Sequence, residues 1–105
     1  MRLSEESERR LTRSLVETLS DTLRQLNEAF REGEKERIRK LGHALKGNSG
    51  AHYFGLTKVK EIGIALDKNP DLAENEWRRM VEELEGVIQA LQTRSPGRDG
   101  RGEAE

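Results

Sequence analysis

The segment from residue 34 to residue 50 contains one of the two histidines of the chain, His43, within a pattern typical of an amphipathic helix. Its apolar residues Ile38, Leu41 and Leu45 fall within roughly 60° of one another at about 100° per residue. His43 lies about 160° from the middle of that cluster, so we expect its side chain to point into solvent. Imidazoles titrate near about pH 6.5, so at neutral pH one ring nitrogen usually has a free lone pair. Such a side chain can act as a nucleophile without an activating base.

The residues around His43 on this outer face are basic or small. Lys46 follows one turn later and can offer an ammonium group to an anion, and Gly47 comes next. A glycine inside a helix costs about 1 kcal/mol relative to alanine. A glycine beside the histidine therefore suggests that another protein must approach the ring closely. The same face is predicted to supply further partner contacts, from Arg39, Lys40 and Gly50.

The run His43-Ala44-Leu45-Lys46-Gly47-Asn48-Ser49-Gly50, followed by Phe54-Gly55-Leu56, resembles the signature of the histidine-containing phosphotransfer (HPt) domain. The family pattern has a histidine, then an apolar residue, a basic residue and a glycine at the positions of Leu45, Lys46 and Gly47. The resemblance extends from about residue 15 to residue 91. Gly55 lies slightly further from the histidine than the corresponding glycine usually does, which predicts a longer turn before the next helix.

The resemblance implies a function as well as a fold. The chain would relay a phosphoryl group between receiver domains of a two-component phosphorelay, through a phosphohistidine at His43. Nε2 would be the attacking atom, Lys46 would support the charge of the phosphoryl group, and Gly47 would give the receiver access. The partners would be receiver domains of a hybrid sensor kinase or a response regulator. The Mg²⁺ of the reaction would lie in the receiver, so this chain would need no cofactor and would be a transfer intermediate, not an enzyme. A hydrophobic patch beside His43, with Leu15 or Leu19 contributing, would dock the receiver.

Four helical patterns would position these residues, and no segment has the alternation of a strand. Ser4 is a suitable N-cap for the first helix, Gly33 should end it, and Asn69 with Pro70 should start the fourth. We expect an all-α, antiparallel up-and-down four-helix bundle over residues 1–94, followed by a disordered polar tail over residues 95–105. The expected helices span residues 4–32, 34–50, 56–68 and 70–93.

Composition excludes several classes of protein. The chain has no cysteine, so it forms no disulfide and no thiolate metal site. Its net charge is −1 and 37% of its residues are charged, which favours neither a nucleic-acid nor a membrane partner. No apolar run approaches the roughly 20 residues that span a bilayer. We expect a cytoplasmic monomer, and the polar tail favours a freestanding chain.

Other interpretations remain open at this level. Taken alone, His43 could be an ordinary surface histidine, and the chain could be a non-catalytic helical adaptor that binds a receiver domain. A third possibility is the dimerisation and phosphoacceptor part of a sensor kinase. His52 is a weaker phosphoacceptor candidate, because it falls close to the core-facing side if the second helix continues. The two histidines should then point in different directions, so we predict no metal site.

Overall fold

The computed structural model describes residues 4–93, and every regular element in this part of the chain is an α-helix. The prediction of an all-helical bundle is therefore confirmed. No described helix is long and apolar enough to cross a membrane. The predicted tail, residues 95–105, lies outside the described residues. The helices are α1 (Glu5–Glu32), α2 (Lys35–Lys46), α3 (Ser49–Tyr53), α4 (Thr57–Lys68) and α5 (Glu74–Thr93).

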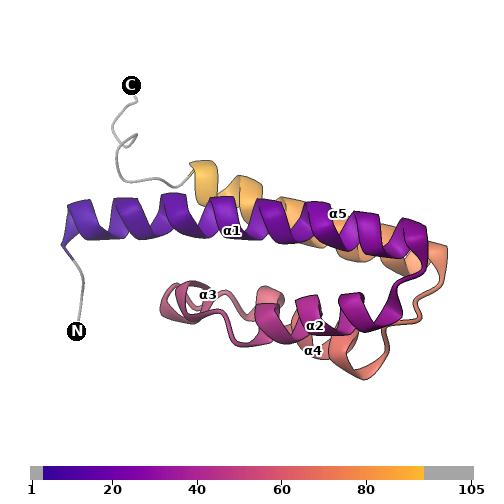
Figure 1. The fold of residues 1–105 in the computed structure, drawn as a ribbon. Helices are drawn as coiled ribbons and strands as arrows, with labels where there is room; N and C mark the ends of the chain where they lie inside the picture. Colours follow the sequence, from indigo (N-terminus) through magenta and orange to yellow (C-terminus); the bar gives the residue numbers. More distant parts are fainter. Residues whose placement is uncertain (1–3, 94–105) are drawn as a thin grey trace.

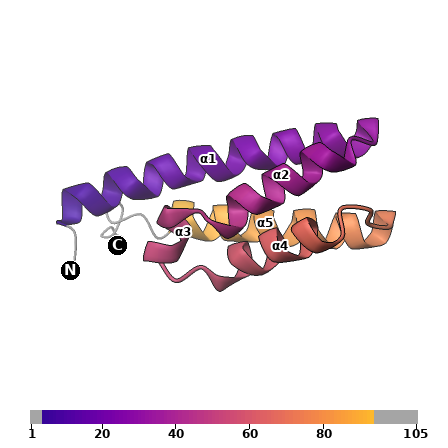
Figure 2. The same cartoon turned by 60° about the horizontal axis from the view of Figure 1, so that its bottom comes forward.

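The helices pair into two layers, with α1 beside α5 and α2 beside α4 (Figures 1 and 2). Leucine and isoleucine side chains from both layers form the core between them. Trp77 of α5 is buried. Its ring stacks on Phe30 with centroids 4.4 Å apart, and its Nε1 donates to Asn27 Oδ1 at 3.1 Å. The core thus joins the first and last helices and supports the shorter pair, α2 and α4.

Both predicted ends of α1 are confirmed. The Ser4 hydroxyl accepts a hydrogen bond from the Ser7 backbone N–H at 3.1 Å, which satisfies one free donor of the first turn. Gly33 has a φ of 69° and closes the helix in the left-handed conformation that glycine adopts without strain. Arg37 then ties the start of α2 to this turn by donating to Glu34 Oε1 at 3.0 Å and Glu28 Oε1 at 3.1 Å. These hydrogen bonds, first that to Glu34, raise the pKa of the Arg37 guanidinium above its ordinary value.

The predicted second helix does not reach Gly50, and on this point the prediction was wrong. α2 stops at Lys46, and α3 begins two residues after Gly47. Asn48 caps the new helix, because its Oδ1 accepts from the Ala51 backbone N–H at 2.8 Å. Asparagine is among the best N-cap residues, and here its local hydrogen bond competes successfully with continuation of the helix. Gly55, with a φ of 67°, then turns the chain into α4.

We expect Asn48→Ala to lower the free energy of unfolding by about 1 kcal/mol, because the N-cap hydrogen bond of α3 is lost. Chemical denaturation followed by circular dichroism measures this change. Ser49→Ala is the matched control at the next position, which is exposed, and it should change stability by less than about 0.5 kcal/mol. Equal stabilities of the two variants would contradict the capping role.

The start of the last helix was also predicted wrongly. Asn69 Oδ1 accepts from the Asp71 backbone N–H at 3.2 Å, which makes a local turn and not a helix cap. α5 begins only at Glu74, where the Glu76 carboxylate accepts from the Ala73 backbone N–H at 3.0 Å. Residues 70–73 therefore form a non-helical connection between the two layers.

Candidate functional site

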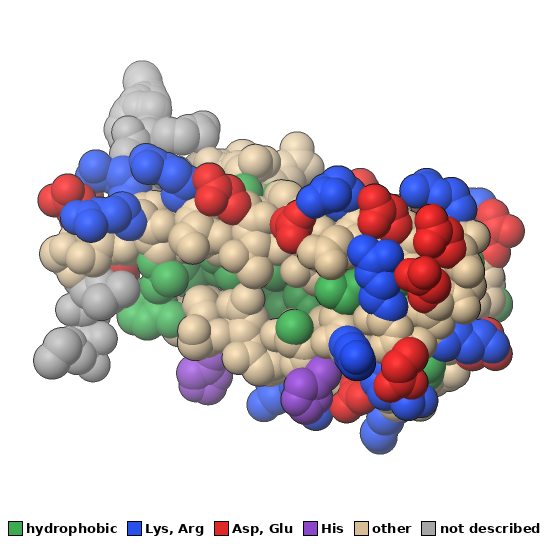
Figure 3. Space-filling model, in the orientation of Figure 1, with side chains coloured by type: hydrophobic (Ala, Val, Ile, Leu, Met, Phe, Trp, Pro, Cys, Tyr) green, Lys and Arg blue, Asp and Glu red, His purple; other side chains and the backbone are tan. Residues whose placement is uncertain are grey.

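The outer face of α2 presents His43 to solvent, as the helical pattern predicts. Its side chain is 71% exposed, whereas Ile38 and Leu45 on the opposite face are buried. Figure 3 shows both histidines, in purple, on the lower side of the molecule, close to several blue basic side chains. An exposed imidazole on a rigid helix can reach a reacting group on another protein.

Asp67 of α4 lies beside this imidazole, and the sequence analysis did not identify it. Its Oδ2 is 3.9 Å from His43 Nδ1 and 3.4 Å from Lys46 Nζ. The distance to His43 is in the range of an ion pair but is longer than a hydrogen bond. The side chains of Lys46 and Asp67 are 36% and 32% exposed, so this pair is partly shielded from water. The site therefore combines an imidazole, an ammonium and a carboxylate from two helices.

Two glycines let α2 and α4 approach closely enough to bring these groups together. A Cβ atom built on Gly63 would lie 2.5 Å from the backbone nitrogen of Lys46 and 2.6 Å from the carbonyl oxygen of Gly42. A Cβ on Gly42 would lie 2.7 Å from Leu66 Cβ. No side chain fits at either position, so the two backbones pack directly against each other. Asp67 comes one turn after Gly63, on the same side of α4.

Gly47 leaves space beyond His43. It is exposed, and a Cβ built there would meet only the His43 carbonyl oxygen within 4 Å, at 3.7 Å. The neighbouring cations are also exposed: Arg39 donates to Glu36 at 3.2 Å, while Lys40 has no ion-pair partner among residues 4–93. These three residues therefore lie on the outer face, as predicted.

Gly50 does not lie on that face, and its predicted contact with a partner is corrected. It is buried in α3, where an added Cβ would come within 3.4 Å of Leu15 Cδ1 in α1. The break at Asn48 changes the direction of the chain, so the helical projection of α2 does not extend to Gly50. Leu15 and Leu19 are 3% and 0% exposed, so they contribute to the core and not to a docking patch.

His52 is exposed, whereas a continuous second helix would have placed it close to the core. It lies on α3, on the same side of the molecule as His43 (Figure 3), so the expectation of different directions was wrong. No group of three or more metal-binding side chains (His, Cys, Asp or Glu) occurs among residues 4–93.

The helical bundle and the exposed histidine on its second helix place the protein among small helical domains that present a histidine on their surface. The model of the Hpt domain family matches residues 10–94, and the chain belongs to this family. Its members are phosphotransfer carriers in two-component signalling, and they interact with receiver domains. Searches of curated proteins and of solved structures found no significant match.

Proposed function

We propose that this protein relays a phosphoryl group between receiver domains, with His43 as the phosphoacceptor. The observation that carries the proposal is the exposed imidazole of His43 beside Lys46 and Asp67, in a chain of the Hpt family. The partners are receiver domains of a hybrid sensor kinase or a response regulator. In this proposal the protein is a cytoplasmic monomer, and its four long helices run antiparallel in up-and-down order. The course of the chain in Figure 1 supports that order.

In the proposed reaction the lone pair of His43 Nε2 attacks the phosphorus of a receiver's aspartyl phosphate. The new P–N bond forms as the bond from phosphorus to the aspartyl oxygen breaks, and the aspartate leaves with the electron pair. Nδ1 keeps its proton throughout. Such transfers depend mainly on positioning and on neutralisation of charge. Mg²⁺ in the receiver supplies part of that neutralisation, and Lys46 supplies more once it turns from Asp67 toward the phosphoryl oxygens.

The experiment is phosphoryl transfer from a panel of receiver domains labelled with radioactive acetyl phosphate. We expect at least one receiver to lose its label to this protein within minutes. The transferred label should be labile in acid and stable in base, as a phosphohistidine is and a phosphoserine is not. A folded protein that accepts label from no receiver contradicts the proposal, and binding without transfer supports the helical adaptor.

Asp67 is a positioning residue in this proposal. Its carboxylate attracts the proton of the imidazole to Nδ1 and so leaves the Nε2 lone pair free. We expect Asp67→Asn to slow transfer to His43 by roughly tenfold, the lower end of the effect of removing a carboxylate that orients a functional histidine. Nitrogen NMR of the imidazole should show a smaller fraction of the Nδ1–H tautomer.

The matched control is Glu61→Gln, which removes the same charge from an exposed position on α4. It should leave both the transfer rate and the tautomer unchanged. A tautomer ratio that is the same in Asp67→Asn and in the wild type would rule out positioning through Nδ1.

A further inference from the structure

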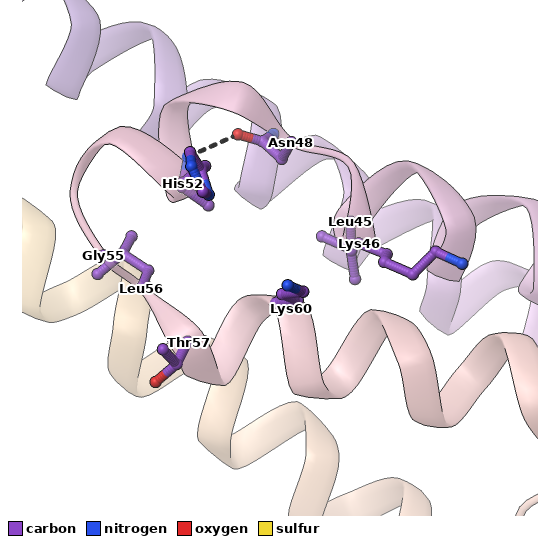
Figure 4. Close-up of a pocket in the computed structure, with 9 residues that line it drawn as sticks. Leu45, Lys46, Asn48, His52, Gly55, Leu56, Thr57 and Lys60 are labelled. Carbon is purple, nitrogen blue, oxygen red and sulfur yellow. Dashed lines mark hydrogen bonds between the residues drawn. The ribbon is translucent and has the colours of Figure 1, made fainter.

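A pocket of about 270 Å³ lies between the end of α2, α3 and the start of α4 (Figure 4). Its apolar walls come from Leu45, Ala51 and Leu56. The exposed side chains of His52 and Lys60 lie at its edge. The stem of Lys46 also lines it, while the ammonium group points away from the hollow. Lys46 thus belongs both to this pocket and to the His43 site.

The charged side chains that line the pocket are basic. No acidic residue lines it, and Lys60 has no ion-pair partner among residues 4–93. Lys46, the other lysine of the lining, pairs with Asp67 at 3.4 Å, so within the described part of the chain Lys60 carries the uncompensated positive charge of the pocket. Lys60, a lysine at the edge of an apolar pocket and without an ion-pair partner among the described residues, favours a ligand with an apolar group for the pocket and an adjacent carboxylate for the lysine.

We infer that this pocket is a selectivity site for the receiver partner, taking an apolar side chain that is followed or preceded by an acidic residue. The inference rests on the proposed function and adds to it the chemistry by which receivers are distinguished. A partner seated over His43 extends across Lys46, and the pocket begins at Lys46. The pocket therefore contacts the receiver beside the reacting groups, where it affects docking and not the transfer itself.

The test compares the variant Lys60→Glu with the wild type, using the labelled receiver that transfers best to the wild type. We expect the receiver concentration that gives half the maximal transfer rate to rise about tenfold at low salt. The glutamate would repel the acidic residue of the receiver that Lys60 attracts. The rate at saturating receiver should stay unchanged. The difference should shrink at about 0.5 M salt, where charges are screened within a few ångströms.

A second variant, Thr57→Glu, places a carboxylate at the same edge without risk to folding. Thr57 is exposed and is the first residue of α4, where an acidic side chain is favourable for the helix. It should weaken docking in the same manner. The matched control is Lys68→Glu, the same charge change on α4 at an exposed position that does not line the pocket.

Three results would overturn the inference while leaving the relay function intact. The first is that neither Lys60→Glu nor Thr57→Glu affects transfer. The second is that Lys68→Glu weakens docking equally, which would show that docking depends on the overall charge of the protein and not on the pocket. A wild-type dimer that Lys60→Glu dissociates would assign the pocket to a second copy of the chain. If the wild type accepts no label from any receiver, the proposed function fails, and the inference fails with it.

Discussion

His43→Gln should abolish the acceptance of label from every phosphorylated receiver domain. A glutamine side chain has a length similar to that of histidine, but its amide nitrogen has no lone pair available for attack on phosphorus. The imidazole is 71% exposed and contributes nothing to the core, so the variant should fold normally. Gel autoradiography after transfer measures the effect, and circular dichroism confirms that the helices are present. We expect a decrease of at least about a thousandfold, the loss typical of removing a nucleophile.

His52→Gln is the matched control, because it makes the same change in the other histidine, which is also exposed. At saturating receiver it should accept label at nearly the wild-type rate, because His52 lies at the edge of the proposed docking pocket and not beside His43. Label on the His43→Gln variant, together with its loss from His52→Gln, would move the phosphoacceptor to α3. The two variants together therefore identify the site without any assumption about the donor.

Helical periodicity was sufficient to predict which face of α2 carries His43. Ile38 and Leu45 are buried and His43, Lys40 and Gly47 are exposed, because burial of one apolar stripe determines how a helix rotates on its core. The ends of α1 were also predictable, since Ser4 and Gly33 act through hydrogen bonds and backbone angles within a few residues. These features could be predicted because they depend on residues that are close to one another in the sequence.

The features that could not be predicted depend on competition or on distance along the chain. Gly47 and Asn48 fit both a weakened helix and a new cap; in the structure the cap hydrogen bond of Asn48 forms, and α3 packs on α1. Asp67 lies 21 residues beyond Lys46, and no periodic pattern relates two helices to each other. The role of Gly63 is the absence of a side chain at the contact with α2, which also depends on a helix distant in the sequence.

Gly63→Ala should destabilise the protein and impair transfer together. The added methyl group would lie 2.5 Å and 2.6 Å from backbone atoms of α2, which cannot rotate away as a side chain can. The two helices must separate, and we expect the free energy of unfolding to fall by about 2 kcal/mol, within the range for overpacked cores. For a domain of this size the melting temperature should fall by about 10 °C.

The same displacement moves the backbone of Lys46, so its ammonium and the neighbouring His43 lose their placement relative to Asp67. Below the melting temperature, where the variant is folded, transfer should be slower by roughly tenfold, because a shift of about 1 Å is enough to impair a positioned site.

The matched control is Gly86→Ala in α5, where a Cβ meets nothing within 4 Å. It should stabilise the protein by about 0.5–1 kcal/mol, as alanine does in an exposed helix, with no effect on transfer. If Gly63→Ala were as stable and as active as Gly86→Ala, close contact between α2 and α4 would not be what holds the site together. Alanine should therefore lower the free energy of unfolding at Gly63 and raise it at Gly86. That difference would show that the close contact between α2 and α4 connects the packing of the bundle to the placement of the His43 site.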